Sequence, residues 1–302
     1  MSIAAIAIGS NSTRMLVRLA DGREVRERAY THLFMGLNQD RMLTAEAMSD
    51  TTAVIGQLKR RALAMGAERV YLYATSAVRD AGNADAFSRR LLLHTGLELT
   101  VISGEAEARL AFEAASCGGH CAVFDLGGGS SELTYGKGSE VIEAASAQEG
   151  AARLSRECAI LTFEDAENVR LLVRDRLRGP YCRLLALPRP SILIGIGGTC
   201  TTSAAIQQQT ASHGDELNGE TVKRDFIEAL LRRIIPLSLE ERTAIPGLYA
   251  SRAAILPHGL CILLALMDLT GFDCFRLSTH NNLDAIVERL DKNPSTQMLT
   301  DE

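Results

Sequence analysis

The chain lacks the long apolar run that a membrane-spanning helix needs. Its longest apolar stretch, residues 253–269, is interrupted by Pro257, His258 and Asp268. No basic region precedes the N-terminal apolar stretch, which has the length of a strand, so we expect no signal peptide. The pattern G-x-x-x-x-G-K-S/T is also missing, and its absence excludes a P-loop NTPase.

A disulfide framework and a zinc site are also unsupported by the sequence. The 7 cysteines are odd in number and scattered, mostly among apolar or small residues, which favours reduced, buried thiols in a cytoplasmic protein. Cys117 and Cys121 flank His120, but a zinc site would need a second cysteine pair, so we expect a glycine-rich loop there. The net charge of -5 argues against general nucleic-acid binding and still permits a locally basic anion site.

What is present indicates an ordinary globular protein. The hydrophobic share is 46% and the charged share 23%, and a length of 302 residues suits two domains better than one core. Strand-like and helical patterns alternate through much of the chain, which predicts an α/β fold with layered helices. We expect strands over residues 3–8, 13–19, 24–29, 69–74, 97–102 and 274–277, and helices over residues 44–66, 83–94, 105–115, 148–158, 164–178, 218–235, 252–269 and 282–290.

The stretch from Val123 to Leu133 organises the rest of the interpretation. An apolar run that includes Asp125 is followed by three glycines, 127–129, by two serines and by a second strand-like run. Glycines let the backbone approach a ligand closely, and a tight turn of free N–H groups forms an anion-binding nest. Asp125 lies at the mouth of this nest, where a carboxylate could hold a metal ion that bridges to phosphate. The alternative is a plain tight hairpin.

The same pattern recurs at the N-terminus, in residues 5–16. When the two stretches are superimposed, Gly9 matches Gly127 and Ser12 matches Ser130. Ala7 falls at the position that Asp125 occupies in the stretch 123–133. This self-similarity suggests two related halves, each opening with a strand, a phosphate turn and a strand.

A third glycine turn occupies residues 192–199. Here a strand-like run meets Gly197, Gly198 and Thr199 and leads into a helical pattern over residues 201–209. A glycine turn at a helix N-terminus is a natural phosphate-binding site.

Taken together, these motifs resemble the exopolyphosphatase / guanosine pentaphosphate phosphohydrolase (Ppx/GppA) family. The resemblance rests on six stretches: residues 8–12, 74–80, 102–110, 124–132, 150–154 and 197–199. It implies the α/β, two-domain actin/sugar kinase/Hsp70-like (ribonuclease H-like) fold with a cleft between domains. We expect domain I over residues 1–118, domain II over residues 119–290 with the last helix packing back on domain I, and a polar tail over residues 291–302.

The resemblance also implies a reaction. Family members release terminal orthophosphate from inorganic polyphosphate or from pppGpp with Mg²⁺ or another divalent cation. Glu107 and Asp125 fall on catalytic positions, Glu107 on the glutamate that would orient and deprotonate water, and both also fall on the metal positions. From the residues alone, Glu107 would read as a surface helix glutamate.

Arg79 falls on a phosphate-gripping arginine, although a loop-end salt bridge is an equally good interpretation. The remaining phosphate-binding residues implied by the resemblance are Ser10, Asn11, Ser12 and Arg14 in the first turn, Gly127, Gly128, Gly129 and Ser130 in the second, and Gly197, Gly198 and Thr199 in the third.

The sequence departs from the family pattern at three places. Ala7 replaces the first-turn aspartate, the segment 34–36 lacks an expected basic residue, and the C-terminal glycine-rich stretch is replaced around residues 281–285. These departures keep open a catalytically impaired protein that binds polyphosphate or a nucleotide. A kinase of the same fold is disfavoured because no adenosine or sugar-binding motif is recognisable. The net charge favours short polyphosphate or a small phosphorylated guanosine nucleotide over a long polyanion, and a homodimer is possible.

Overall fold

The computed structural model describes residues 1–212 and 214–292. The chain divides into two compact units, each built around its own sheet. The first unit comprises Met1–Leu110 together with the C-terminal helix, and the second comprises Ala111–Asn281. In the part of the chain that is described, no helix is both long and apolar enough to cross a membrane.

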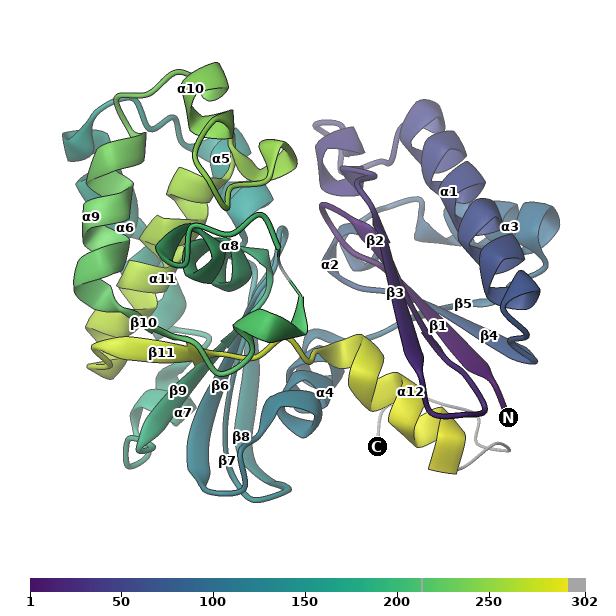
Figure 1. Cartoon of the computed structure of the whole chain (residues 1–302). Helices are drawn as coiled ribbons and strands as arrows, with labels where there is room; N and C mark the ends of the chain where they lie inside the picture. Colours follow the sequence, from purple (N-terminus) through teal and green to yellow (C-terminus); the bar gives the residue numbers. More distant parts are fainter. Residues whose placement is uncertain (213, 293–302) are drawn as a thin grey trace. The chain divides into compact units, whose positions relative to one another are not determined.

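The first unit contains a five-stranded sheet in the order β3-β2-β1-β4-β5 (Figure 1). Its strands are β1 (Ile3–Ile8), β2 (Thr13–Arg18), β3 (Glu24–Ala29), β4 (Arg69–Ala74) and β5 (Leu99–Val101). Its helices are the 3-10 helix η1 (Leu33–Gly36), α1 (Ala45–Ala64), α2 (Ser76–Arg79), α3 (Ala84–Thr95), the first half of α4 (Gly104–Ala115) and α12 (Asn282–Lys292).

The burial of these strands follows their place in the sheet. Every residue of β1 is buried because β1 pairs on both sides, antiparallel with β2 and parallel with β4. The edge strand β3 has no buried residue and carries four charged side chains. Charged side chains on an edge strand disfavour pairing with a strand of another chain. Helices α1 and α12 both pack on β1 and β2.

The second unit contains a six-stranded sheet in the order β10-β11-β9-β6-β7-β8. Its strands are β6 (His120–Leu126), β7 (Ser131–Lys137), β8 (Glu140–Ala147), β9 (Ile192–Ile196), β10 (Thr221–Lys223) and β11 (Cys274–Leu277). Its helices are α5 (Ala151–Glu157), α6 (Phe163–Arg178), α7 (Cys182–Leu185), α8 (Gly198–Gln207), η2 (Asp215–Leu217), α9 (Arg224–Ile234), α10 (Leu239–Thr243), η3 (Ala250–Arg252) and α11 (Leu256–Thr270).

Helix α11 forms the centre of the second unit. Its residues from Leu256 to Met267 are all buried, and it packs against α5, α6, α8 and α9 (Figure 1). A helix that is apolar on all sides is stable only when it is enclosed in this way.

The two sheets share one strand arrangement. Read from its β8 edge, the second sheet has an antiparallel meander, β8-β7-β6, followed by the parallel strands β9 and β11. The first sheet has the same order, β3-β2-β1 followed by the parallel strands β4 and β5. The strand arrangement therefore supports the two related halves that the repeated glycine turn suggested, within a mixed α/β fold.

Three elements differ from the expectations from sequence. The helix expected over residues 218–235 begins only at Arg224, because Thr221–Lys223 form β10 and pair with β11, which places Val222 opposite Phe275. The helix expected over residues 252–269 begins only at Leu256, and Pro257 lies in its first turn, where the missing N–H costs no hydrogen bond. Residues 76–79, expected in a loop, form the short helix α2.

The chain end and the cysteines also depart from expectation in part. The last helix continues to Lys292, and the rest of the expected tail lies outside the described residues. All cysteines are free thiols, as expected, but Cys117, Cys182 and Cys274 are exposed and not buried.

Candidate active site

The turn between β1 and β2 presents backbone N–H groups without partners. The Gly9 N–H donates to the carbonyl of Ser12 over 3.1 Å, and a Cβ on Gly9 would lie 2.9 Å from that oxygen, which is why glycine is required. The carbonyls of Ser10 and Asn11 accept hydrogen bonds from the backbone of residues 32–34. No described residue accepts a hydrogen bond from the N–H groups of Ser10, Asn11 or Ser12, so these groups are available to an anion.

The turn between β6 and β7 has the same geometry. The Gly127 N–H donates to the carbonyl of Ser130 over 3.0 Å, and a Cβ on Gly127 would again lie 2.9 Å from the acceptor. The carbonyls of Gly127 and Gly128 accept hydrogen bonds from the first turn of α5, and Arg153 Nε donates to the carbonyl of Gly129 over 2.7 Å. Among the described residues, nothing accepts from the N–H groups of Gly128 and Gly129. Helix α5 thus holds the carbonyl side of the turn and leaves the amide side open.

Gly150 fixes this turn by close backbone contact. A Cβ on Gly150 would lie 2.5 Å from the carbonyl carbon and oxygen of Gly128 and from the nitrogen of Gly129. The structure therefore gives a role to the stretch 150–154, which sequence reasoning had used only to recognise the resemblance. Gly150 permits the approach of α5, and Arg153 completes it with a hydrogen bond.

The residue before this clamp, Glu149, is a buried acid. Burial raises the pKa of Glu149, and the Arg176 guanidinium, 3.4 Å away, opposes the rise only in part. A raised pKa disfavours the ionised form of this carboxyl group, which belongs to the residue next to Gly150.

Asp125 lies beside a second buried carboxylate, Glu132. The two residues are directly paired between β6 and β7, so their side chains leave the same face of the sheet. Asp125 is 8% exposed and Glu132 is 2% exposed, and the Ser146 hydroxyl donates to Glu132 Oε1 over 2.7 Å. Sequence reasoning did not assign a role to Glu132; an acid directly after the two serines of the second glycine turn was the signal that could have found it. No group of three or more metal-ligating side chains is formed among the residues that the structure describes.

The third glycine turn begins α8 and is covered by an arginine. Gly197 has a φ of 93°, a conformation that favours glycine, and it packs against the Leu126 carbonyl. The guanidinium of Arg252 lies directly against Gly198, in the space a side chain would fill. Thr199 is 2% exposed and packs under Gly259 of α11, so its side chain does not face solvent. Arg252 is a residue that sequence reasoning missed, since it lies more than 50 positions away from the turn.

Glu107 and Arg79 form an ion pair within the first unit. Glu107 lies in the first turn of α4, where Ser103 Oγ accepts a hydrogen bond from the Ala106 N–H. Arg79 Nη1 donates to Glu107 Oε2 over 3.2 Å and to the Ile102 carbonyl over 3.0 Å. The Nη2 atom of Arg79 is buried and has no hydrogen-bond partner in the described parts of the chain.

Arg79 follows β4 directly, as the first glycine turn follows β1. Because β1 and β4 are parallel neighbours, the turn and Arg79 lie at the same edge of the sheet. Arg14 is paired with Ala7 across β1 and β2, so both side chains leave the same face. The first unit thus holds Ser10–Ser12, Arg14, Arg79 and Glu107, and the second holds Asp125, Gly127–Ser130 and Gly197–Thr199.

Comparison with known proteins identifies the family to which this arrangement belongs. The model of the Ppx/GppA phosphatase family matches residues 24–281. The chain is 32% identical over 310 residues to proteins named exopolyphosphatase 2 from two strains of Mycobacterium tuberculosis, CDC 1551 / Oshkosh and H37Rv, covering 94% of this chain and 97% of each relative.

Solved structures agree with this assignment. A crystal structure of the Aquifex aeolicus member of the Ppx/GppA family is 26% identical, with a TM-score of 0.80 and coverage of 97% of this chain and 99% of that chain. A crystal structure of an exopolyphosphatase from Cytophaga hutchinsonii is 23% identical, with a TM-score of 0.85 and coverage of 97% and 98%, and supports the fold alone. The expected fold class is confirmed by these matches. The chain belongs to the Ppx/GppA phosphatase family.

Proposed function

We propose that this protein hydrolyses the terminal phosphoanhydride bond of inorganic polyphosphate and releases orthophosphate. The observation that carries the proposal is the buried Arg79–Glu107 pair, in which Arg79 keeps one guanidinium nitrogen without a partner. A phosphate oxygen is a fitting partner for that nitrogen, because guanidinium–phosphate hydrogen bonds are charge-assisted. The names of the curated relatives, exopolyphosphatase 2, support the same substrate class.

In this proposal the backbone binds the phosphates. The N–H groups of Ser10–Ser12 and of Gly128 and Gly129 donate to phosphate oxygens, whereas the Gly127 N–H closes its own turn, and Arg14 adds positive charge beside the first turn. Gly197–Thr199 would add backbone donors at the start of α8, where Arg252 already supplies a guanidinium. Because both glycine turns hold their carbonyls in internal hydrogen bonds, neither needs to rearrange to accept an anion.

Glu107 supplies the base. Its carboxylate accepts a proton from the attacking water, whose oxygen forms a bond to the terminal phosphorus while the anhydride P–O bond breaks. The electron pair of that bond leaves with the shortened polyphosphate. Arg79 holds the Glu107 carboxylate by a hydrogen bond and, through Nη2, offsets the negative charge of the transferred phosphoryl group.

The residues of the second unit fit a divalent cation such as Mg²⁺. Asp125 and Glu132 place two carboxylates on one sheet face, and Mg²⁺ is commonly held by one or two carboxylates with waters and substrate phosphates. When bound, the cation would neutralise phosphate charge. The resemblance names Glu107 as a second metal position; its pairing with Arg79 leads us to assign Glu107 to the water instead.

A comparison of neighbouring glutamates tests the proposal. Phosphate release should be measured with Mg²⁺ from short polyphosphate and, side by side, from pppGpp. Glu107→Gln should lower kcat by at least about 100-fold, as expected for loss of a general base. Glu105→Gln is the matched control, because Glu105 lies in the same helical turn but is exposed and, among the residues that the structure describes, is paired with Arg109 alone. Equal activity of both variants and the wild type would reject the role of Glu107.

Ala7 supports a second candidate, a protein that binds polyphosphate or a guanosine nucleotide with little turnover. Ala7 is 1% exposed and replaces the carboxylate that the family pattern places at the end of the first strand. Ala7→Asp would put that carboxylate opposite Arg14, its cross-strand partner. A marked gain of phosphate release in Ala7→Asp, with weak release by the wild type, supports this candidate; rapid release by the wild type contradicts it.

A further inference from the structure

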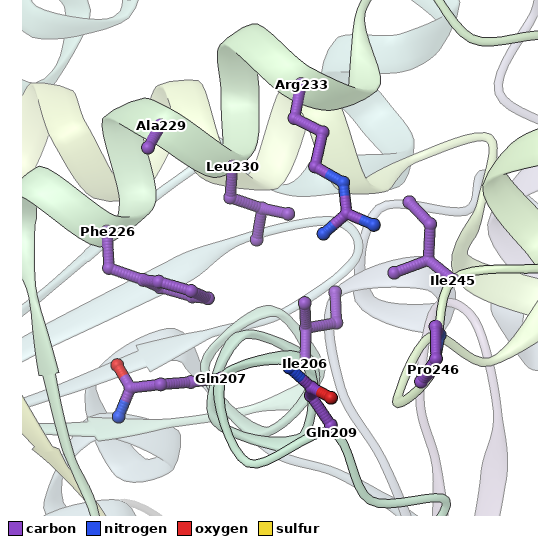
Figure 2. A pocket seen from close by; sticks show the side chains of 9 residues that line it. All are labelled: Ile206, Gln207, Gln209, Phe226, Ala229, Leu230, Arg233, Ile245 and Pro246. Atoms are coloured by element: carbon purple, nitrogen blue, oxygen red, sulfur yellow. The ribbon is translucent and has the colours of Figure 1, made fainter.

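A second concave site lies in the second unit, outside the glycine turns. It is a cavity of about 350 Å³ between the end of α8, one face of α9 and the loop after α10 (Figure 2). This volume is at the small end of the range for small-molecule sites. None of its lining residues belongs to the phosphate turns or to the Arg79–Glu107 pair.

The cavity has an apolar floor and one charged side. Ile206, Leu230 and Ile245 form the floor and are each at most 5% exposed, and the ring of Phe226 flanks them. Figure 2 shows the guanidinium of Arg233 extending into the space between these side chains. No acidic residue lines the cavity.

Arg233 is an exposed residue of α9 whose guanidinium does not stabilise the fold through a polar contact within the described residues. In the described residues it forms no ion pair and no side-chain hydrogen bond, although it lies in the last turn of α9. The ordinary role of such an arginine is to bind the free carbonyls at the helix end. That role is taken by Arg242, which donates to the carbonyls of Ile234 over 2.8 Å and Ile235 over 3.2 Å. The neighbouring Arg232 points elsewhere, 3.7 Å above the ring of Phe163.

The glutamines at the lip add hydrogen-bonding groups. Gln207 donates through Nε2 to the Thr221 carbonyl, which fixes its side chain beside the cavity. Gln209 has a φ of 51°, an uncommon value for a residue other than glycine, and its side chain also lines the cavity (Figure 2). The site therefore combines an apolar surface, one unpaired cation and amide groups at its edge.

We propose that this cavity binds a small amphipathic carboxylate, with a compact aromatic or branched aliphatic body on the apolar floor and the carboxylate on Arg233. The argument is charge complementarity: a single guanidinium without an acidic neighbour attracts an anion, and its planar geometry matches a carboxylate. The apolar floor excludes strongly hydrated anions such as free phosphate as preferred ligands. This site is separate from the proposed phosphohydrolase chemistry, and its test does not depend on phosphate release.

The test uses the fluorescent anion 8-anilinonaphthalene-1-sulfonate on the purified full chain. We expect one saturable site from which 4-phenylbutyrate displaces the probe, while uncharged 4-phenylbutanol is weaker by about tenfold, because it lacks the charge-assisted contact. Tripolyphosphate in excess should not displace the probe, which distinguishes this site from the glycine turns.

Three variants locate the binding. Arg233→Ala should weaken 4-phenylbutyrate binding by about tenfold, as loss of a charge-assisted contact predicts. Ala229→Phe should abolish it, because Ala229 is exposed at the cavity wall and a larger side chain fills the space without removing a contact. Arg232→Ala, which removes the same charge from the adjacent position, should bind as the wild type does. Wild-type binding by Arg233→Ala and Ala229→Phe, or equal displacement by acid and alcohol, overturns the proposal.

Discussion

Replacing Gly150 by alanine should damage the second phosphate turn without touching any residue of the turn. The backbone of Gly150 has a φ of -139°, which alanine adopts easily, so the effect is purely steric. The new Cβ would lie 2.5 Å from atoms of Gly128 and Gly129, and ordinary contact begins at 3.4 Å, so the turn or α5 must yield by about 0.9 Å. Overpacking of this kind costs about 1–3 kcal/mol of stability.

The same displacement should reduce function. A shift of about 1 Å in a positioned group lowers the rate about 100-fold, which corresponds to about 2.7 kcal/mol of transition-state stabilisation. The assays are phosphate release from short polyphosphate and calorimetric binding of tripolyphosphate, each with a thermal unfolding curve.

Gly179→Ala is the control for this experiment. Gly179 ends α6 with a φ of -65°, and a Cβ there would meet nothing within 4 Å. We expect this variant to keep full activity and equal or slightly higher stability. If Gly150→Ala has the same unfolding midpoint, tripolyphosphate affinity and rate of phosphate release as Gly179→Ala, the view that α5 holds the turn by backbone contact is refuted.

Two further predictions concern carboxylates of the second unit. Burial alone would raise the pKa of Asp268, but hydrogen bonds from Arg170 and Arg224, each as short as 2.6 Å, hold it below its usual range. Asp268→Asn should therefore lower the free energy of unfolding at pH 7 by about 1–3 kcal/mol, measured by urea unfolding. The difference in stability between the variant and the wild type should shrink as the pH falls from about 4 through the lower pKa of folded Asp268. The reason is that Asp268 stabilises the fold only while its carboxylate is ionised. The exposed Asp175→Asn is the control, and a deficit that persists undiminished at pH 2 contradicts the reasoning. Glu132→Gln should raise the Mg²⁺ concentration needed for half-maximal phosphate release by about tenfold, as loss of one supporting carboxylate predicts; an unchanged Mg²⁺ requirement removes Glu132 from the metal site.

Local features of the site could be read from sequence because they depend on neighbouring residues. The turns at Gly9 and Gly127 are closed by a hydrogen bond across three positions, so glycine and serine spacing was enough to match them. Such features need no knowledge of distant contacts.

The features that sequence missed depend on contacts between distant segments. Val222 belongs to a strand only because Phe275 is its partner, more than 50 residues later, so the helical pattern there was misleading. Glu132 matters through its register with Asp125, and the Arg79–Glu107 pair joins α2 to α4. Asn83 lies directly before α3, but its side chain bonds the backbone of Leu43 and does not cap the helix.

The two matching glycine turns have the same main-chain geometry, although the residue at the acid position differs between them. Each cradle is made by main-chain geometry, and the acid of the preceding strand is no part of it: the turn after Ala7 and the turn after Asp125 close with the same hydrogen bond. Under the proposed function, a substitution at the acid position would change the chemistry beside a turn without changing the main-chain N–H groups that the turn offers to phosphate.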